Sequence, residues 1–138
     1  MDDAALASII AGCRRIAVVG ISDRASRPSH MVARYLKDHG FSIVPVNPKL
    51  TEVLGEKCYP DLQSIPEPVD MVDVFRQAAD CPPIAEDAVA VGAKVLWLQL
   101  GIVSEEALRI AAAGGLTVVM DRCLKVEHAR LRDAGSIR

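Results

Sequence analysis

The stretch Arg15-Ile16-Ala17-Val18-Val19-Gly20-Ile21-Ser22, followed by the polar segment 23–29, decides the fold of this chain. Its short apolar run is rich in β-branched residues, which is typical of a strand covered on both faces in a parallel sheet. Gly20 ends the run, and the lack of a Cβ there lets a ligand approach the backbone closely. The pattern therefore predicts a buried strand that runs into a phosphate-binding loop.

The segment behind this strand carries hydroxyl groups and positive charge. Ser22, Arg24, Arg27 and Ser29 supply both, and such groups bind phosphate through charge-assisted hydrogen bonds. Pro28 suits the first turn of a helix, and its unpaired N–H groups and macrodipole would attract an anion. The helix continues to about residue 40, with apolar residues at helical spacing: Met31, Val32, Tyr35 and Leu36. The alternative is a glycine turn without a ligand, which any βα unit needs.

Length and composition limit the possible classes of protein. With 138 residues, 51% of them hydrophobic, the chain suffices for one domain, residues 1–138, with a substantial core. The net charge of −2 and the aromatic content of 4% argue against nucleic-acid binding. No apolar run reaches transmembrane length, and two acidic residues follow Met1, where a signal peptide would carry positive charge. We therefore expect a cytoplasmic protein without a membrane segment.

The cysteines and histidines do not form a recognisable catalytic or metal motif. Without a CxxC pair the cysteines lack zinc-finger and redox spacing, so we interpret them as reduced thiols and expect no metal site. The three histidines lie in contexts typical of helical surfaces, so a Cys–His nucleophile is not indicated. The four cysteines are Cys13, Cys58, Cys81 and Cys123.

Strands and helices alternate along the rest of the chain. Further strands are predicted at 41–46, 71–75, 95–101 and 116–120, and helices at 2–13, 82–92, 104–114 and 124–131. Segment 52–69 is expected to connect them with little regular structure, except for a turn of helix near 61–64. Pro45 predicts that the second strand bends or stops pairing there. This alternation is typical of an α/β fold with a doubly wound parallel sheet.

Polar residues follow several of these strands, at the sheet edge where such folds bind ligands. Gln99 lies in an otherwise apolar run and needs a hydrogen-bond partner. We interpret Arg122 and Asp121 as a structural ion pair. The polar residues at strand ends are Ser22 with Arg24 and Arg27, Asn47 with Lys49, then Arg76, Gln99 and Arg122.

The end of the second strand discriminates between nucleotide ligands. NAD-binding folds usually carry an acidic residue there for the ribose diol. This chain has Asn47 and Lys49 instead, and a cation suits a ribose that carries a phosphate. The second and third glycines of the GxGxxG pattern are also missing after Gly20. A dinucleotide pyrophosphate is therefore a poor fit.

Six segments together resemble the single-domain CoA-binding proteins of the YccU type. The resemblance extends from about Ile9 to Leu131. This family is also similar to the CoA-binding domain of the succinyl-CoA synthetase α subunit and of acyl-CoA synthetases that form nucleoside diphosphate. The segments are AVVGISDRASRPSHMVARYL (17–36), VPVNPK (44–49), EVLGEKCYPDLQSIP (52–66), VDVFR (72–76), WLQLG (97–101) and VVMDRCLKVEHARL (118–131).

The resemblance implies a Rossmann-like α/β fold in three layers, whose five-stranded parallel sheet has the order 3-2-1-4-5 and holds coenzyme A. It also implies where the parts of the ligand lie. The diphosphate would contact Gly20, Ile21, Ser22, Asp23, Arg24, Arg27 and Ser29. The 3′-phosphate end would meet Lys49, next to Val46, Asn47 and Pro48. The path of the nucleotide and pantetheine arm would be lined by Phe75, Arg76, Leu98, Gln99, Leu100 and Gly101.

We therefore expect a protein that binds CoA or an acyl-CoA without catalysis of its own, as a carrier, sensor or partner of a separate enzyme chain. In the synthetases that it resembles, the phosphorylated histidine belongs to another domain, so no histidine here inherits that role. One alternative is an NADP-binding oxidoreductase in which Lys49 contacts the 2′-phosphate. Another is an interaction module with a vestigial pocket. Cys123 follows the last predicted strand and is the thiol that could face the site.

Overall fold

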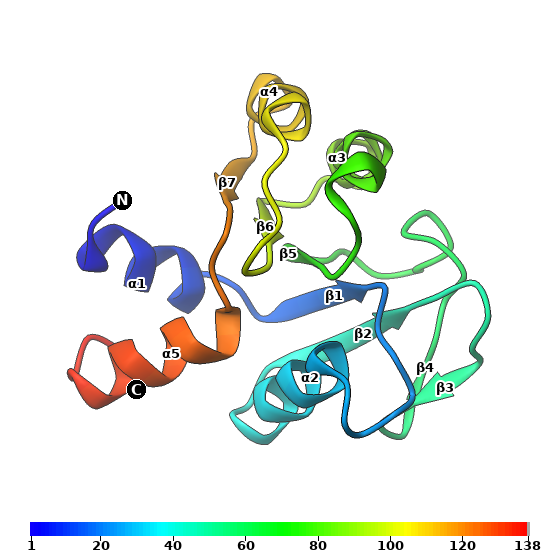
Figure 1. Ribbon diagram of the computed structural model, residues 1–138, viewed down its shortest axis with the longest axis horizontal. Helices are drawn as coiled ribbons and strands as arrows, with labels where there is room; N and C mark the ends of the chain where they lie inside the picture. The colour runs from blue at the N-terminus through cyan, green and yellow to red at the C-terminus, as the bar shows by residue number, and fades with distance from the viewer. Residues whose placement is uncertain (138) are drawn as a thin grey trace.

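Five parallel strands form the central sheet of the computed structural model, which describes residues 1–137 (Figure 1). Their order in the sheet is β2-β1-β5-β6-β7. Each strand is short, and four of the five match the predicted segments closely; β6 ends before the predicted Gln99. The strands are β1 (Arg15–Val19), β2 (Ser42–Val46), β5 (Met71–Val74), β6 (Val95–Leu98) and β7 (Thr117–Val119).

The strand order reverses at β1: the chain adds β2 on one side of β1 and later adds β5 on the other side, both parallel to it. Beyond β2, Tyr59 forms a single parallel bridge with Val46. Counted with this bridge as the third position, the sheet follows the expected 3-2-1-4-5 pattern, and β7 extends it. In this count β5 takes the fourth position, although it is the third strand of this sheet along the chain. The Rossmann-like α/β fold is confirmed.

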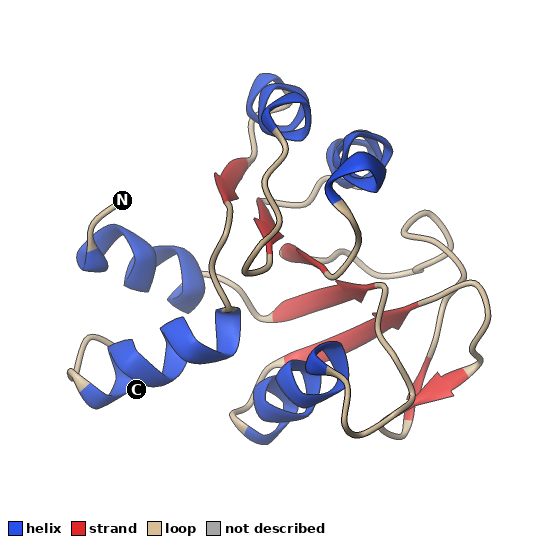
Figure 2. Cartoon of the chain, in the orientation of Figure 1, coloured by secondary structure: helices blue, strands red, loops and turns tan. Residues whose placement is uncertain are grey.

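Helices cover both faces of the sheet (Figure 2). One face carries α1 (Asp3–Ala11), α2 (Pro28–Asp38) and α5 (Leu124–Asp133), and the other carries α3 (Cys81–Ala90) and α4 (Glu105–Ala113). The predicted cap of α4 is confirmed, because Ser104 Oγ accepts a hydrogen bond from the Ala107 N–H at 3.1 Å. No helix among residues 1–137 has the length and apolar character needed to cross a bilayer.

The two faces have cores of different composition. Large side chains such as Trp97, Leu6 and Ile10 fill the side of α1, α2 and α5. On the other side small residues of α3 and α4 face the sheet, and this lets the helices pack closely. They are Ala85, Ala88, Ala107 and Ala111, all fully buried.

His128 also belongs to the core, contrary to its expected place on a helical surface. It is buried on α5, and its Nδ1 lies 2.7 Å from the hydroxyl oxygen of Tyr35 on α2. Burial lowers the pKa of this imidazole below its ordinary value, with smaller effects from His39 and Arg132. The histidine therefore joins α5 to α2 within the core.

Pro45 does not interrupt β2, contrary to the expectation from sequence. The strand pairs with β1 through Val46, in register with Val19. In a parallel strand the N–H and C=O of one residue point to the same neighbour. The Pro45 carbonyl accepts from Tyr59 N–H on the outer side, at 3.0 Å, so the missing N–H also faces outward and no bond to β1 is lost.

Segment 52–69 contains a hairpin that the sequence analysis missed. Strands β3 (Glu52–Val53) and β4 (Glu56–Lys57) pair antiparallel. Leu54 and Gly55 between them have φ values of 54° and 76°, as a two-residue type I′ turn requires. Lys37 supports the turn, because its Nζ donates to the Leu54 carbonyl at 2.6 Å. Residues 61–64, where a turn of helix was expected, form a non-helical turn instead. The Asp61 carboxylate closes it by accepting a hydrogen bond from the Ser64 N–H.

Candidate functional site

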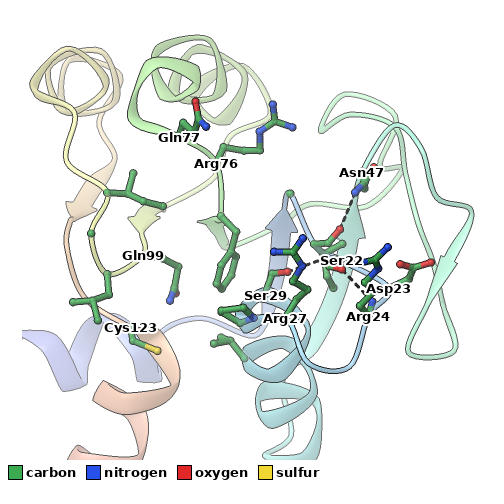
Figure 3. Close-up of a pocket in the computed structure, with 18 of the residues that line it drawn as sticks. Ser22, Asp23, Arg24, Arg27, Ser29, Asn47, Arg76, Gln77, Gln99 and Cys123 are labelled. Carbon is green, nitrogen blue, oxygen red and sulfur yellow. Dashed lines mark hydrogen bonds between the residues drawn. The ribbon is translucent and has the colours of Figure 1, made fainter.

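A cleft of about 1170 Å³ opens at the carboxyl ends of the strands. The loop between β1 and α2 forms one wall, and the segments that follow β2, β5 and β6 form the floor and the opposite wall, up to the start of α5 (Figure 3). This is the edge of the sheet at which the strand order reverses beside β1, where α/β folds place their ligands.

Gly20 occupies a place in this cleft that no other residue fits. Its φ is +85°, and a Cβ would lie 2.8 Å from the Phe75 carbonyl oxygen and 2.8 Å from Cδ of Arg76. Its N–H donates to the Val46 carbonyl at 3.0 Å. From the sequence, this glycine was expected to let a ligand approach the backbone. The structure shows that the missing side chain first makes room for the chain itself, where β1 and β5 end.

The loop after Gly20 is held by its own polar groups. The Ser22 N–H donates to Ser29 Oγ at 2.9 Å, and the Arg24 N–H donates to Ser22 Oγ at 3.1 Å. Asn47 Nδ2 donates to the Ile21 carbonyl at 2.8 Å, which ties the loop to the end of β2. These bonds fix the loop backbone before any ligand arrives.

Positive charge gathers around this loop without neutralising partners. Among residues 1–137, Arg24, Arg27 and Lys49 form no salt bridge, whereas Arg76 lies 3.3 Å from Asp80. The first turn of α2 opens on the same side, and its N-cap residue Arg27 makes no side-chain cap. Free N–H groups at a helix start and unpaired cations attract the same kind of ligand, an anion.

Asn47 is a structural tie, since both ends of its amide are used. Besides the bond to Ile21, its Oδ1 accepts from the Lys49 N–H at 2.8 Å. The side chain therefore shapes the exit of β2 and presents Lys49 to the cleft. Each polar atom already holds one backbone partner, so the amide cannot accept from both hydroxyls of a ribose diol as a free carboxylate would.

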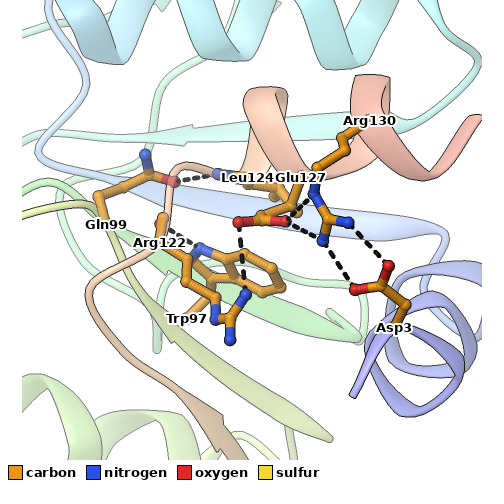
Figure 4. Close-up of polar contacts among 7 residues, drawn as sticks. All are labelled: Asp3, Trp97, Gln99, Arg122, Leu124, Glu127 and Arg130. Atoms are coloured by element: carbon orange, nitrogen blue, oxygen red, sulfur yellow. Dashed lines mark hydrogen bonds and ion pairs between the residues drawn. The ribbon is translucent and has the colours of Figure 1, made fainter. Parts of the chain in front are cut away.

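Gln99 closes the floor of the cleft and has the partner that its burial demands. It is 5% exposed, and its Oε1 accepts a hydrogen bond from the Leu124 N–H at 3.2 Å (Figure 4). Its Nε2 has no hydrogen-bond acceptor within the described part of the chain. The residue lines the cleft, so this amide group is available to a ligand.

Cys123 lies at the N-cap of α5, on the opposite side of the cleft from Arg24 and Asn47 in the view of Figure 3. It is half-buried, and its side chain makes no capping hydrogen bond. The other three cysteines are buried, and burial raises the pKa of each thiol, to about 11 for Cys13. Cys123 is thus the one thiol of the described residues that faces the cleft.

The predicted pairing of Arg122 with Asp121 is wrong. Arg122 lies 3.4 Å from Glu127, and its carbonyl accepts from Trp97 Nε1 at 2.8 Å (Figure 4). The Asp121 carboxylate instead accepts from the Gly101 N–H at 2.7 Å. Both residues therefore hold the β6 and β7 exits together and lie outside the cleft lining.

The cleft gathers all of the site residues predicted from the sequence except three. Val46 and Pro48 line a smaller adjoining hollow of about 330 Å³, which shares Gly20 and Arg76 with the cleft, and Leu98 is fully buried in the core. Most of the lining that was missed comes from the start of α2 and from loops, for which the sequence carries no phosphate or strand-end signal. These residues are Pro28, Val32, Leu50, Gln77, Ala78 and Ile102.

Comparison with known proteins identifies close relatives over almost the whole chain. The family model described as CoA binding domain matches residues 14–129. The uncharacterized protein YneT of Bacillus subtilis is 45% identical over 126 residues, covering 91% of this chain and 93% of YneT. A hypothetical protein from Pyrococcus horikoshii has a solved structure with a TM-score of 0.93 and 39% identity, covering 96% of this chain and 93% of that one.

A larger enzyme contains a related segment. An ADP-forming acetate–CoA ligase of Archaeoglobus fulgidus is 26% identical over 119 residues. The match covers 79% of this chain and only 17% of the ligase. The likeness therefore concerns one part of that enzyme.

Proposed function

Because the chain belongs to the CoA-binding domain family, we propose that it binds coenzyme A in the cleft at the carboxyl ends of its strands. The observation that carries the proposal is the anion site beside Gly20: a rigid loop, an uncapped start of α2, and the unpaired cations Arg24, Arg27 and Lys49. CoA carries a diphosphate and a 3′-phosphate, so it matches this concentration of positive charge.

The cleft offers a place for each part of the ligand. The diphosphate binds at residues 21–29 and the start of α2. Lys49 contacts the 3′-phosphate, and the adjoining hollow beside Val46 and Pro48 takes the adenine ring, since its lining also includes the apolar Leu62. The pantetheine arm then runs over Phe75 and Gln99 toward Cys123, where the Gln99 amide can donate to one of its carbonyl groups.

We propose that this chain binds CoA or an acyl-CoA without transforming it, as a carrier, sensor or partner of a separate enzyme chain. No histidine is among the residues that line the cleft in the described part of the chain, and Asp23 is its one acidic residue. Nothing there supplies a base beside the Cys123 thiol. The matched segment of the acetate–CoA ligase belongs to a much longer chain, which fits a role beside other catalytic parts. We place the protein in the cytoplasm, because its cysteines are free, as in a reducing compartment.

A second candidate is NADP, because Lys49 would also suit a 2′-phosphate. Three features favour CoA. The loop carries only Gly20 of the dinucleotide glycine pattern, and the Asn47 amide is occupied by backbone groups. The cleft also extends beyond the phosphate loop to Cys123, which gives room to a long arm ending in a thiol.

A ligand panel tests the proposal. CoA, acetyl-CoA, NAD and NADP are compared by thermal shift and calorimetric titration, since a ligand at 100 times its dissociation constant adds about 2.7 kcal/mol to stability. We expect the CoA compounds to stabilise and the dinucleotides to have little effect. Stabilisation by NADP without any by CoA would contradict the proposal.

A matched pair of arginine variants locates the site. Arg27→Ala should weaken CoA binding roughly tenfold or more, because an unpaired cation at the phosphate loop is lost. Arg34→Ala is the control, since Arg34 is exposed on the same helix and does not line the cleft. Equal affinities of the two variants would move the diphosphate away from α2.

A further inference from the structure

Cys123 is set apart from the other cysteines by its position. It lines the cleft and is partly exposed, and its sulfur is not used to cap α5. Cys13, Cys58 and Cys81 are buried. Reaction at a thiol requires access and a thiolate, and burial removes both. The three buried cysteines therefore serve as unreactive internal controls for a reaction at Cys123.

A second feature at the same end of the cleft points to a ligand. Gln99 is 5% exposed, and its Oε1 accepts a hydrogen bond from the Leu124 N–H (Figure 4). Its Nε2 has no acceptor in the described part of the chain. Leu124 directly follows Cys123, so the same side chain that orders the start of α5 presents an amide donor beside the thiol. This donor faces the cleft without a protein acceptor, so a ligand in the cleft can supply one. The amide carbonyls of a pantetheine arm are such acceptors.

Resting on the proposed binding of CoA, we propose that Cys123 takes up CoA covalently by thiol–disulfide exchange with a CoA disulfide. The Cys123 thiolate attacks the sulfur of the CoA half that lies in the cleft, and a new S–S bond forms between them. The original S–S bond breaks, and the other half leaves as a thiolate that takes a proton from water. The protein is oxidised to a mixed disulfide and the leaving CoA is reduced, so the electrons balance without another oxidant.

The shape of the cleft favours this exchange over reaction with other disulfides. The bound nucleotide holds the reacting sulfur near Cys123, which turns a bimolecular encounter into a reaction within a complex. At the rim beside this end, Leu100 is 69% exposed, so the departing half meets an open edge. A disulfide that lacks the nucleotide has no contact with the phosphate loop and gains none of this proximity.

The test uses the reduced full-length protein with CoA disulfide, and with glutathione disulfide at the same concentration. Intact-mass spectrometry should show the addition of one CoA, removed by dithiothreitol, and peptide mapping should locate it at Cys123. The rate should saturate with CoA disulfide and exceed that with glutathione disulfide by about tenfold or more. Equal rates with the two disulfides would show a merely exposed thiol and overturn the proposal.

Two alanine variants and a binding measurement separate this proposal from the one on which it rests. Cys123→Ala should lose the adduct, whereas Cys13→Ala should keep it, and calorimetry of the wild-type protein measures CoA binding separately. If wild-type protein binds CoA but gains no adduct, the exchange is refuted and CoA binding stands. If wild-type protein neither binds CoA nor gains an adduct, both proposals fail.

Discussion

Gly20 and Phe75 approach each other so closely that a Cβ on Gly20 would lie 2.8 Å from the Phe75 carbonyl oxygen. Backbone atoms cannot yield as the end of a flexible side chain can. This contact joins the end of β1 to the end of β5, at the centre of the sheet. The conformation of the loop that follows Gly20 is therefore coupled to the stability of the fold.

Gly20→Ala should destabilise the protein more than Gly40→Ala. Both glycines have a positive φ, 85° and 91°, so each alanine costs about 1–2 kcal/mol of backbone strain. A Cβ on Gly40 meets nothing within 4 Å, whereas one on Gly20 adds a collision worth roughly 1–3 kcal/mol. Urea unfolding of the two variants measures the difference. Equal costs would mean that β1 and β5 separate easily at this point.

Lys49→Ala should weaken the binding of CoA far more than the binding of dephospho-CoA. A charge-assisted contact with the 3′-phosphate corresponds to roughly ten- to a hundredfold in affinity, and only CoA would lose it. Because Lys49 is exposed, rising salt should also narrow the preference of the wild-type protein. Calorimetric titration with both ligands measures the effect.

The control for Lys49 is Lys57→Ala on β4, a lysine that lies outside the cleft lining. It should leave the preference for CoA unchanged. If Lys49→Ala keeps the full discrimination between the two ligands, one of Arg24, Arg27 and Arg76 must contact that phosphate instead.

Asp73→Asn should stabilise the protein, increasingly so as the pH rises above about 3.8. Asp73 is fully buried in β5 and its carboxyl oxygens have no hydrogen-bond partner. Burial raises the pKa of this carboxyl well above its ordinary value of 3.8. The unfolded chain then releases its proton at a lower pH than the folded chain, so the wild-type protein loses stability with rising pH until the folded pKa is passed. Unfolding free energies from pH 3 to pH 8, roughly the range of ordinary carboxyl titration and beyond, test this.

Asp70→Asn is the matched control, with the opposite sign. Burial tends to raise the pKa of Asp70, but hydrogen bonds from the Arg15 and Arg14 N–H groups and the nearby Lys94 lower it below 3.8 overall. Its contribution to stability is present above the unfolded pKa and is lost as the pH falls through the folded one. This variant should therefore be destabilised at neutral pH. The same pH trend in both variants would contradict the assignment of Asp73.

The purified protein should not hydrolyse acetyl-CoA or longer acyl-CoAs. The reason is the lack of a base beside Cys123 among the residues that line the cleft. Thiol release followed with a chromogenic reagent measures this. Turnover that disappears in Cys123→Ser would overturn the expectation of a non-catalytic protein.

Much of the fold could be predicted because its signals are local. The apolar runs that become β1 and β6 and the cap at Ser104 are each readable within a few residues. The hairpin β3–β4 could not be predicted, since its turn puts Leu54 at a φ of 54°, a conformation that leucine does not favour. The strained turn is stabilised by a hydrogen bond from Lys37, which is distant in the sequence.

The cleft was predictable where polar residues follow strands, and less so elsewhere. Ser22, Arg24 and Lys49 carry a chemical signal in the sequence, and the structure brings them to one place. Val32 and Leu50 reach the cleft only through the packing of α2 and the β2 exit, which spacing does not reveal. The role of Gly20 was predicted only in part, because its close neighbour Phe75 lies more than fifty positions later in the sequence.

Pro45 also limits how this molecule can associate with others. Its nitrogen and its carbonyl both face the outer side of β2, where one cannot donate and the other is already engaged by Tyr59. A strand from a second molecule would therefore find an incomplete ladder on that side. At the opposite edge β7 spans three residues, Thr117–Val119, which offers too short a template for stable strand addition. The sheet is thereby protected at both ends against edge-to-edge growth into aggregates.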